Sequence, residues 1–243
     1  MACGEFGEGK MTEPNEIIKE IEQYFNFKNK KFKAIVTAGP THEYIDPVRF
    51  ISNKSSGKQG FALAKALTKK GFDTTLISGP TNQKNEKNIK IIKVETADEM
   101  FKATQRSLPA DIAIFSAAVA DFKIKEQRRK KIKKDEKLNL SFEKNIDILN
   151  YISNHNSLRP KIVIGFAAET DNIEKNSLKK LIEKNCDWII SNDVSNKKIG
   201  FESDYNEVRI FYKDKNINNE VLSIKRKSAI ADEIVDRIVN QLN

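Results

Sequence analysis

Apolar runs that alternate with amphipathic segments dominate this chain and restrict the folds open to it. Short apolar runs with the character of buried strands are Phe32–Ala38, Thr74–Ser78, Ile89–Val94, Ile112–Ser116, Lys161–Ala167 and Trp188–Ser191. Segments with helical periodicity are Gly57–Lys70, Ala97–Leu108, Ile146–Asn154, Ile173–Asn185 and Lys227–Leu242. Strands joined by helices of this length pair in parallel, with helices on both faces of the sheet. We therefore predict an α/β, Rossmann-like three-layer fold with a mostly parallel sheet.

Near the C-terminus the pattern changes to that of an antiparallel pair. The segments Glu207–Lys213 and Val221–Lys225 alternate in polarity around the turn-like stretch Asp214–Asn219. This arrangement predicts a C-terminal β-hairpin.

A long polar turn between the first strand and the first helix is the strongest candidate for a ligand-binding feature. It includes Thr37–Thr41 and the Gly- and Ser-rich stretch Asp46–Gly60. Free backbone N–H groups and the positive end of the following helix favour phosphate there. The loops Gly39–Asn53, which belongs to this turn, Ala117–Lys134, Ala167–Asn172 and Asn192–Asn206 all follow strands. Because ligands bind outside the carboxyl ends of parallel strands, we expect these loops to meet at one edge of the sheet.

Composition excludes several classes of protein. The formal net charge of +9 suits nucleic acid, small anions or a solvated basic surface, but no aromatic residues interleave with the densest basic run, Arg128–Lys134. No membrane span and no secretory signal pattern are present in the sequence. Cys3 and Cys186 are too few for a disulfide framework, and the histidines His42 and His155 are too few for a zinc site. We expect a cytoplasmic protein that binds neither nucleic acid nor membrane.

The run Asp-Pro-Val-Arg-Phe-Ile-Ser-Asn-Lys-Ser-Ser-Gly at residues 46–57 is long and specific. From about Lys33 to the C-terminus, the chain resembles phosphopantothenoylcysteine synthetase, the ligase of coenzyme A synthesis. In bacteria this ligase is usually the C-terminal half of a bifunctional protein that also contains a flavin-dependent decarboxylase. The resemblance implies a ligase domain over residues 31–243, a homodimer with sites shared between subunits, and CTP as the nucleotide.

The reaction implied by the resemblance is an amide ligation in two steps. The carboxylate of 4′-phosphopantothenate attacks the α-phosphorus of CTP, which gives an acyl cytidylate and pyrophosphate. The amine of L-cysteine then displaces CMP to give 4′-phosphopantothenoyl-L-cysteine. Both substrates of the first step are polyanions, so we expect Mg²⁺ and lysines to assist. The metal ligands and any base for the amine stay open.

The resemblance also implies roles for individual residues. Asn53 and Lys131 are the expected catalytic residues, and Lys131 opens a Lys-x-Lys-Lys motif on a flap that closes over the intermediate. The expected contacts of the acyl intermediate are Asn53, Gly57, Ala117 and Ala118. The expected contacts of the nucleotide are Phe115, Ser116, Ala117, Asp121, Lys131, Asn145, Asp147, Ile148, Phe166, Lys180 and Lys184.

Without the resemblance, these residues have structural alternatives. Asn53 or Asp121 can cap a helix, Phe166 can be a core residue, and Lys180 and Lys184 can form a solvated helix face. Lys131 can belong to a solvated basic run. Two departures from the family pattern weaken the transfer of roles: Asn-Ile-Asp-Ile at residues 145–148 replaces Asn-Pro-Asp-Ile, and His42 replaces a common Arg.

The first 30 residues differ from the rest. The stretch Met1–Met11 resembles the substrate clamp of the decarboxylase, in which the cysteine of Ala-Cys-Gly is catalytic. The flavin-binding body of the decarboxylase is absent, so we expect neither FMN binding nor activity from Cys3. We expect a linking helix over Asn15–Asn26. We also expect the charged stretch Lys123–Lys137 to be mobile without ligand.

The main alternative function is that of an NAD(P)-dependent Rossmann-fold reductase. Such an enzyme needs a glycine-rich first turn, a ribose-reading residue after the second strand and a catalytic Tyr-x-x-x-Lys pair. The second strand here ends in Ser78-Gly79-Pro80 without an acid, and the Tyr-x-x-x-Lys match, Tyr24 to Lys28, precedes the first strand. A nucleic-acid-binding module is a third possibility, although no recognised motif supports it.

Overall fold

The computed structural model describes residues 13–18, 21, 32–133, 139–195 and 203–242. The strands are β1 (Lys33–Ala38), β2 (His42–Tyr44), β3 (Phe50–Ser52), β4 (Asp73–Ser78), β5 (Lys90–Lys93), β6 (Ile112–Phe115), β7 (Phe122–Ile124), β8 (Phe142–Lys144), β9 (Ile162–Glu169), β10 (Trp188–Asp193), β11 (Tyr205–Tyr212) and β12 (Glu220–Arg226). The helices are α2 (Lys58–Lys69), α3 (Ala97–Arg106), α4 (Ile148–Ser153), α5 (Ile173–Glu183) and α6 (Lys227–Leu242). Among the described residues, no helix has the length and apolar character needed to cross a membrane.

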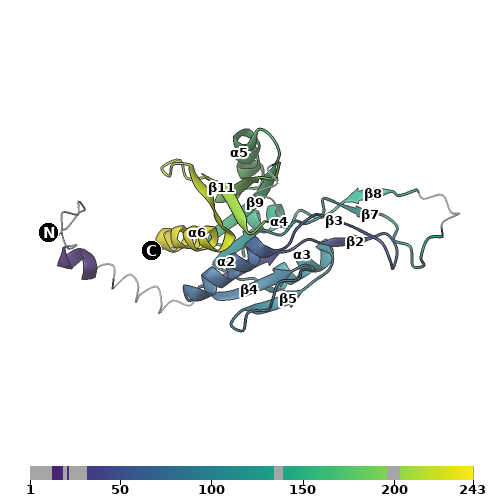
Figure 1. The fold of residues 1–243 in the computed structure, drawn as a ribbon, viewed down its shortest axis with the longest axis horizontal. Coiled ribbons are helices and arrows are strands. Elements are labelled where there is room, and N and C mark those ends of the chain that lie inside the picture. Colours follow the sequence, from purple (N-terminus) through teal and green to yellow (C-terminus); the bar gives the residue numbers. More distant parts are fainter. Residues whose placement is uncertain (1–12, 19–20, 22–31, 134–138, 196–202, 243) are drawn as a thin grey trace.

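The central element is an eight-stranded sheet in the order β12-β11-β10-β9-β6-β1-β4-β5 (Figure 1). The strands from β10 to β5 are parallel, and β11 and β12 add an antiparallel hairpin. The predicted fold and hairpin are therefore confirmed. From β1 the chain goes to β4 on one side, and from β6 it goes to β9 on the other, so the strand order switches between β1 and β6. Such a switch in strand order is where doubly wound sheets bind ligands.

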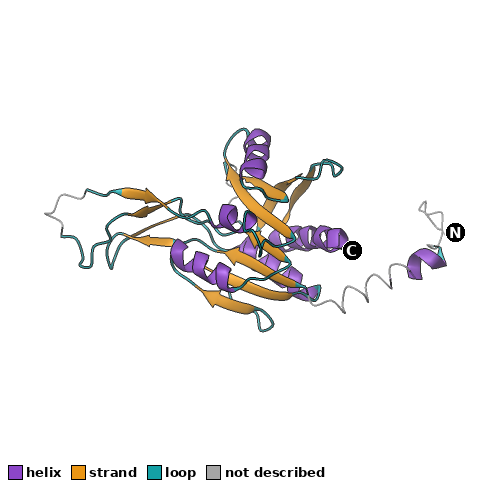
Figure 2. Cartoon of the chain, turned by 180° about the vertical axis from the view of Figure 1, so that it is seen from behind, coloured by secondary structure: helices purple, strands orange, loops and turns teal. Residues whose placement is uncertain are grey.

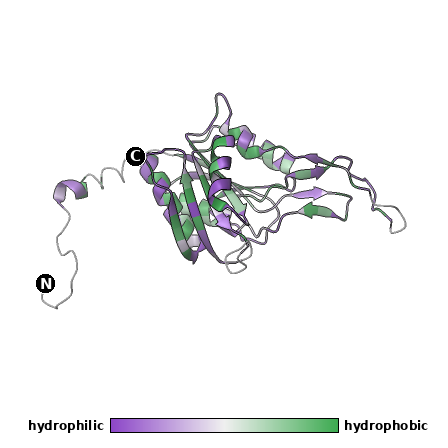
Figure 3. Cartoon of the chain, turned by 90° about the horizontal axis from the view of Figure 1, so that it is seen from above, coloured by the Kyte–Doolittle hydropathy of each residue, from purple (hydrophilic) through white to green (hydrophobic). Residues whose placement is uncertain are grey.

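Helices cover both faces of the sheet (Figure 2). On one face α2 and α6 pack on the sheet through Leu63, Leu67, Ile230 and Ile234, all fully buried. On the other face α3 and α4 pack through residues such as Met100 and Ile152, and α5 adds Leu181 near β10. The hydropathy colouring of Figure 3 shows much of the apolar sequence in the strands and helices of this body.

Two small antiparallel ribbons project from the body and form an arm that the sequence did not predict (Figures 1 and 2). β2 pairs with β3, and β7 pairs with β8. The loops predicted over Gly39–Asn53 and Ala117–Lys134 were therefore wrong in part, because each contains strand residues. Each of these strands has only three residues, which is too short to show a strand period, and β7 finds its partner across a long intervening segment.

The predicted N-terminal helix and the charged stretch Lys123–Lys137 lie partly within the described residues. Residues 14–18 and 21 are helical, in agreement with the start of the predicted helix Asn15–Asn26, whereas its remaining positions lie outside the described residues. The clamp-like stretch Met1–Met11, with Cys3, also lies outside them. Within Lys123–Lys137, the first residues belong to β7 and residues 134–138 are not described. The proposed division at residue 31 stays a prediction.

Candidate functional site

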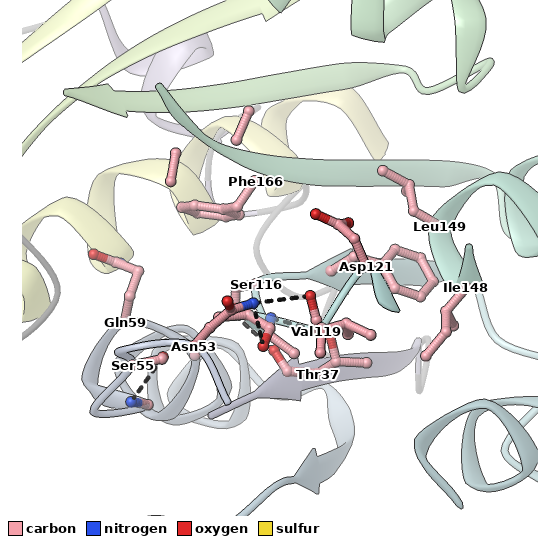
Figure 4. A pocket seen from close by; sticks show the side chains of 18 of the residues that line it. Thr37, Asn53, Ser55, Gln59, Ser116, Val119, Asp121, Ile148, Leu149 and Phe166 are labelled. Carbon is pink, nitrogen blue, oxygen red and sulfur yellow. Dashed lines mark hydrogen bonds between the residues drawn. The ribbon is translucent and has the colours of Figure 1, made fainter. Parts of the chain in front are cut away.

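A cavity of about 820 Å³ lies at the carboxyl ends of the parallel strands (Figure 4). Its size is in the range of small-molecule sites. The wall is formed by Thr37, residues 53–60, residues 115–122, residues 144–149, residues 166–168, Lys180, Lys184, Ile189, Asn192, Asn206 and Lys227. The loops after β1 and β6 meet there with the carboxyl ends of β9 and β10, as the sequence predicted, whereas residues 196–202 of the predicted loop Asn192–Asn206 lie outside the described residues.

Nearly every residue assigned to the site from the sequence lies on this wall. The wall contains Asn53, Gly57, Phe115, Ser116, Ala117, Ala118, Asp121, Asn145, Asp147, Ile148, Phe166, Lys180 and Lys184. Lys131 is the exception, since it is exposed on the loop after β7 and does not line the cavity. The structure thus brings the predicted residues other than Lys131 together on the wall of one cavity.

Asn53 joins two of the site loops. Its Nδ2 donates to the carbonyl oxygens of Val119 at 3.0 Å and Ala118 at 3.3 Å (Figure 4). Helix α2 instead takes Gly57 as its N-cap, with no side-chain capping bond. The alternative of Asn53 as a helix cap is therefore wrong. The exposed amide lies where the loop after β1 meets the loop after β6.

Glycines let the start of α2 approach the strand ends closely. Gly57 has φ +73°, a left-handed conformation that favours glycine. A Cβ at Gly60 would lie 2.5 Å from the Cβ of Ala38 and 2.7 Å from Oγ of Ser116. The positive N-terminal end of α2 is therefore held beside the cavity, which suits phosphate.

The end of β6 is tied to the end of β1. Ser116 Oγ donates to the carbonyl oxygen of Thr37 at 2.6 Å, and the N–H of Ala117 donates to Thr37 Oγ1 at 3.3 Å. Phe115 is 7% exposed and packs in the core beneath α3 and α4. Phe166 is only partly buried, so its ring is more available to a ligand than that of Phe115.

Two ion pairs place lysines of α5 at the cavity. Lys184 Nζ lies 2.5 Å from Asp147 Oδ2, and Lys180 Nζ lies 2.6 Å from Glu169 Oε1. The bond to Asp147 raises the pKa of Lys184 above its usual value. Asp147 also caps α4 by accepting from the N–H of Asn150 at 2.8 Å, which explains why α4 starts at Ile148 rather than at the predicted Ile146. Lys180 and Lys184 belong to the wall and are not only a solvated face.

Two buried acceptors on the wall have no partner among the described residues. They are Gln59 Oε1 and Asn145 Oδ1. Asn145 uses its Nδ2 to donate to the carbonyl of Ala120 at 2.9 Å, which orients the amide. A buried acceptor without a donor costs about 1–3 kcal/mol, so hydroxyl or amino groups of a ligand are suitable partners.

Sequence reasoning missed Gln59, Asn206 and Lys227. Asn206 is 3% and Lys227 7% exposed, and both lie on the wall. Burial, and then the charge of Lys58, lower the pKa of Lys227 to about 8. Gln59 lies inside the glycine-rich stretch Asp46–Gly60, and Asn206 ends the predicted loop Asn192–Asn206. Lys227 lies far from any glycine-rich turn and carries no local signal of a site, so only the tertiary structure identifies it.

A second cavity of about 990 Å³ adjoins the first and shares Ser55, Ser56 and Lys58 with it. His42 lines this second cavity, with its ring stacked on Phe50 at a centroid distance of 3.8 Å. Among the described residues, no cluster of three or more His, Cys, Asp and Glu side chains is arranged to hold a metal ion.

The parallel sheet, its switch in strand order and a cavity at a helix N-terminus define a doubly wound, Rossmann-like α/β protein with a small-molecule cavity. The family described as DNA/pantothenate metabolism flavoprotein C-terminal domain matches residues 29–242, and the chain belongs to this family. The resemblance found in the sequence is thereby confirmed.

Curated relatives include the coenzyme A biosynthesis bifunctional protein CoaBC of Haemophilus influenzae, which is 41% identical over 244 residues covering 99% of this chain and 60% of that protein. CoaBC of Escherichia coli is 40% identical over 247 residues, with 99% and 60% covered. This chain thus spans about 60% of the length of these relatives.

Among solved structures, the C-terminal domain of a CoaBC protein matches with a TM-score of 0.73 and 34% identity, covering 88% of this chain and 96% of that one. A Cab2 mutant in complex with phosphopantothenate-cysteine matches with a TM-score of 0.70 over 96% of this chain and 94% of that one. At 15% identity this second likeness concerns the fold alone.

Proposed function

We propose that this chain ligates 4′-phosphopantothenate to L-cysteine, with CTP as the activating nucleotide, in coenzyme A biosynthesis. Membership of the family and the bifunctional CoaBC relatives support the proposal. The observation that carries it is the single cavity in which the N-terminal end of α2, Asn53 and the paired lysines of α5 meet. The family membership favours this ligase over an NAD(P)-dependent reductase.

In the first step, a carboxylate oxygen of phosphopantothenate bonds to the α-phosphorus of CTP while the bond to the leaving pyrophosphate breaks. Negative charge builds on the phosphates during this step. The α2 end and the Gly57 turn are the groups placed to stabilise it, because their backbone N–H groups need no reorganisation. The oxygen of the Asn53 amide can accept from a ligand hydroxyl, and its Nδ2 can donate to a phosphate oxygen by giving up its longer bond to Ala118.

In the second step, the free amine nitrogen of cysteine bonds to the acyl carbon, the carbon–oxygen bond to CMP breaks, and the nitrogen loses a proton as the neutral amide forms. Phe166 lines the cavity and is proposed to stack on the base, and the oxygen of Asn145, which has no partner among the described residues, is proposed to accept from an amino group. Lys180 and Lys184 are proposed to bind the nucleotide at the α5 side of the cavity.

Magnesium is proposed to arrive with the nucleotide. Mg²⁺ is usually held by one or two carboxylates together with substrate phosphates, so a site needs no cluster of acids. The exposed carboxylate of Asp121 on the wall fits as one such ligand. When bound, the ion would neutralise phosphate charge.

Lys131 is proposed to act after its loop moves toward the nucleotide. The loop after β7 now lies along the arm, where the N–H of Arg128 donates to the carbonyl of Ile45 at 2.9 Å. A lysine on a closing loop can stabilise charge on the departing pyrophosphate.

A homodimer is proposed because the arm exposes aromatic side chains. Phe50, Phe122 and Phe142 are each about half exposed, at 45%, 51% and 50%. Grouped exposed aromatic residues are typical of protein interfaces. A decarboxylase domain in a longer form of this protein, and a cytoplasmic location, belong to the same proposal.

The test is release of pyrophosphate from 4′-phosphopantothenate with CTP or ATP and Mg²⁺, with and without cysteine. We expect release with CTP that increases when cysteine is added, and a product mass that matches phosphopantothenoylcysteine. Folded protein that releases no pyrophosphate with either nucleotide would contradict the proposal.

A further inference from the structure

Lys227 is the first residue of α6 and is almost completely buried on the cavity wall. Lysine is rarely buried to this extent in proteins. Its backbone is fixed on both sides: its N–H donates to the carbonyl of Asp204 at 2.8 Å, and its carbonyl accepts from Gln59 Nε2 at 3.5 Å. The residue is thus held against the start of α2.

A second lysine lies at the same end of the cavity. Lys58 is the first residue of α2, lines the wall, and has its Nζ 2.5 Å from Asp204 Oδ1. Burial is the largest cause of the lowered pKa of Lys227, and the positive charge of Lys58 lowers it further, while Asp204 acts in the opposite direction. Among the described residues, Lys227, Lys58 and the exposed carboxylate of Asp204 therefore share this corner.

Two lysines at one end of the cavity wall favour an anionic ligand at that end. Like charges held close together at a pocket wall, one of them out of water, disfavour their own charged forms. The N-terminal ends of α2 and α6 add positive potential to the same corner. A polyphosphate would relieve the repulsion between the two ammonium groups.

We propose that Lys227, assisted by Lys58, binds the terminal phosphates of the nucleoside triphosphate in this cavity. The identity of that nucleotide rests on the function proposed above, whereas the recognition of a polyphosphate rests on the geometry of this corner. Lys227 is thereby a phosphate-binding residue that lies more than 150 positions from the glycine-rich turn.

The experiment compares the wild type with Lys227→Met and Lys227→Arg in titrations with CTP, CMP and inorganic tripolyphosphate. Lys225→Gln is the matched control, because it removes one positive charge two residues away, where Lys225 pairs with Glu233 at 2.6 Å outside the cavity wall. Circular dichroism and thermal unfolding establish that each variant is folded.

For Lys227→Met we expect affinity for CTP and tripolyphosphate to fall about tenfold, as for loss of a charge-assisted bond, with CMP affinity nearly unchanged. Lys227→Arg should recover part of the loss, and Lys225→Gln should bind like the wild type. If Lys227→Met does not fold, the wild type is compared with Lys227→Arg and Lys58→Met instead. We expect Lys58→Met to weaken tripolyphosphate binding.

Three results would overturn the inference: unchanged CTP affinity in folded Lys227→Met, equal losses for CTP and CMP, or a wild type that binds no tripolyphosphate. Failure of the proposed ligase function would give a different set of results. In that case the wild type would make no phosphopantothenoylcysteine, yet its binding of tripolyphosphate would still depend on Lys227.

Discussion

The carboxylate of Asp46 accepts a hydrogen bond from the backbone N–H of Ile132 at 3.2 Å, across 86 residues of sequence. Asp46 is fully buried and also accepts from the N–H groups of Val48 and Arg49, each at 2.8 Å, and from Arg49 Nη1 at 2.6 Å. Burial alone would raise the pKa of Asp46, but these hydrogen bonds and the charge of Arg49 hold the pKa below its usual value. Ile132 follows Lys131, so this carboxylate anchors the loop that carries the proposed catalytic lysine.

The first prediction concerns this anchor. Asp46→Asn keeps the shape of the side chain but replaces an acceptor oxygen by a donor. We expect kcat for pyrophosphate release to fall about tenfold, since small misplacements of a catalytic group are costly. Trypsin should also cleave faster within residues 128–133. The control is Asp73→Asn at the exposed start of β4. Unchanged kcat and unchanged cleavage would show that Asp46 does not position the loop.

A second prediction concerns pH. In the free protein Lys227 has a pKa of about 8, so its charge is mostly present at pH 7 and is lost as the pH rises toward 9. Affinity for tripolyphosphate should therefore decline between pH 7 and 9 in the wild type. The decline in affinity should be shallower in Lys227→Met. Parallel pH profiles of tripolyphosphate affinity for the wild type and Lys227→Met would contradict a role for the Lys227 charge.

The third prediction separates the two roles of Asp147. Asp147→Ser keeps a capping oxygen for α4 but removes the ion pair with Lys184, whereas Asp147→Ala removes both. We expect Asp147→Ala to lower the free energy of unfolding by about 1 kcal/mol relative to Asp147→Ser. Both variants should alter KM for CTP to a similar degree. A change in KM in Asp147→Ala alone would assign the effect to the helix and not to the charge.

The fourth prediction tests the close approach at α2. Gly60→Ala should destabilise the fold by about 1–3 kcal/mol, because its Cβ would overlap Ala38 and Ser116. It should also weaken CTP binding by displacing the start of α2. Gly71→Ala provides the comparison, since Gly71 has φ +94° but an added Cβ would meet no atom within 4 Å, so only backbone strain is added. Denaturant titration and calorimetry measure the two effects, and wild-type CTP binding by folded Gly60→Ala would contradict the close-approach argument.

The fifth prediction addresses the arm. Replacing Phe122 and Phe142 together by Ser should shift a dimer toward monomer in sedimentation velocity, because both rings are half exposed on the β7–β8 ribbon. Ile182→Ser on α5 is the control, being an even more exposed apolar residue at 78% on a different part of the body. A wild-type protein that sediments as a monomer would rule out the proposed homodimer.

The sequence predicted the elements that neighbouring residues specify and missed those whose pairing depends on residues far away in the chain. The strands of the sheet and the helices that cover it were predicted to within a few residues, because continuous apolar runs and helical periodicity are local. The short strands β2, β3, β7 and β8 were missed, because three residues show no periodicity and their pairing depends on distant segments.

By itself, then, the sequence determined the α/β class, the glycine-rich turn and the motif residues from Asn53 to Lys184, because each can be recognised from a short run of neighbouring residues. The tertiary structure alone decided that Lys227 shares a wall with that turn, that Asp147 holds Lys184, and that Asp46 anchors the Lys131 loop. The physical reason is that burial, ion pairing and the pKa of a buried lysine depend on neighbours brought together by the sheet. No local pattern of residues specifies those neighbours.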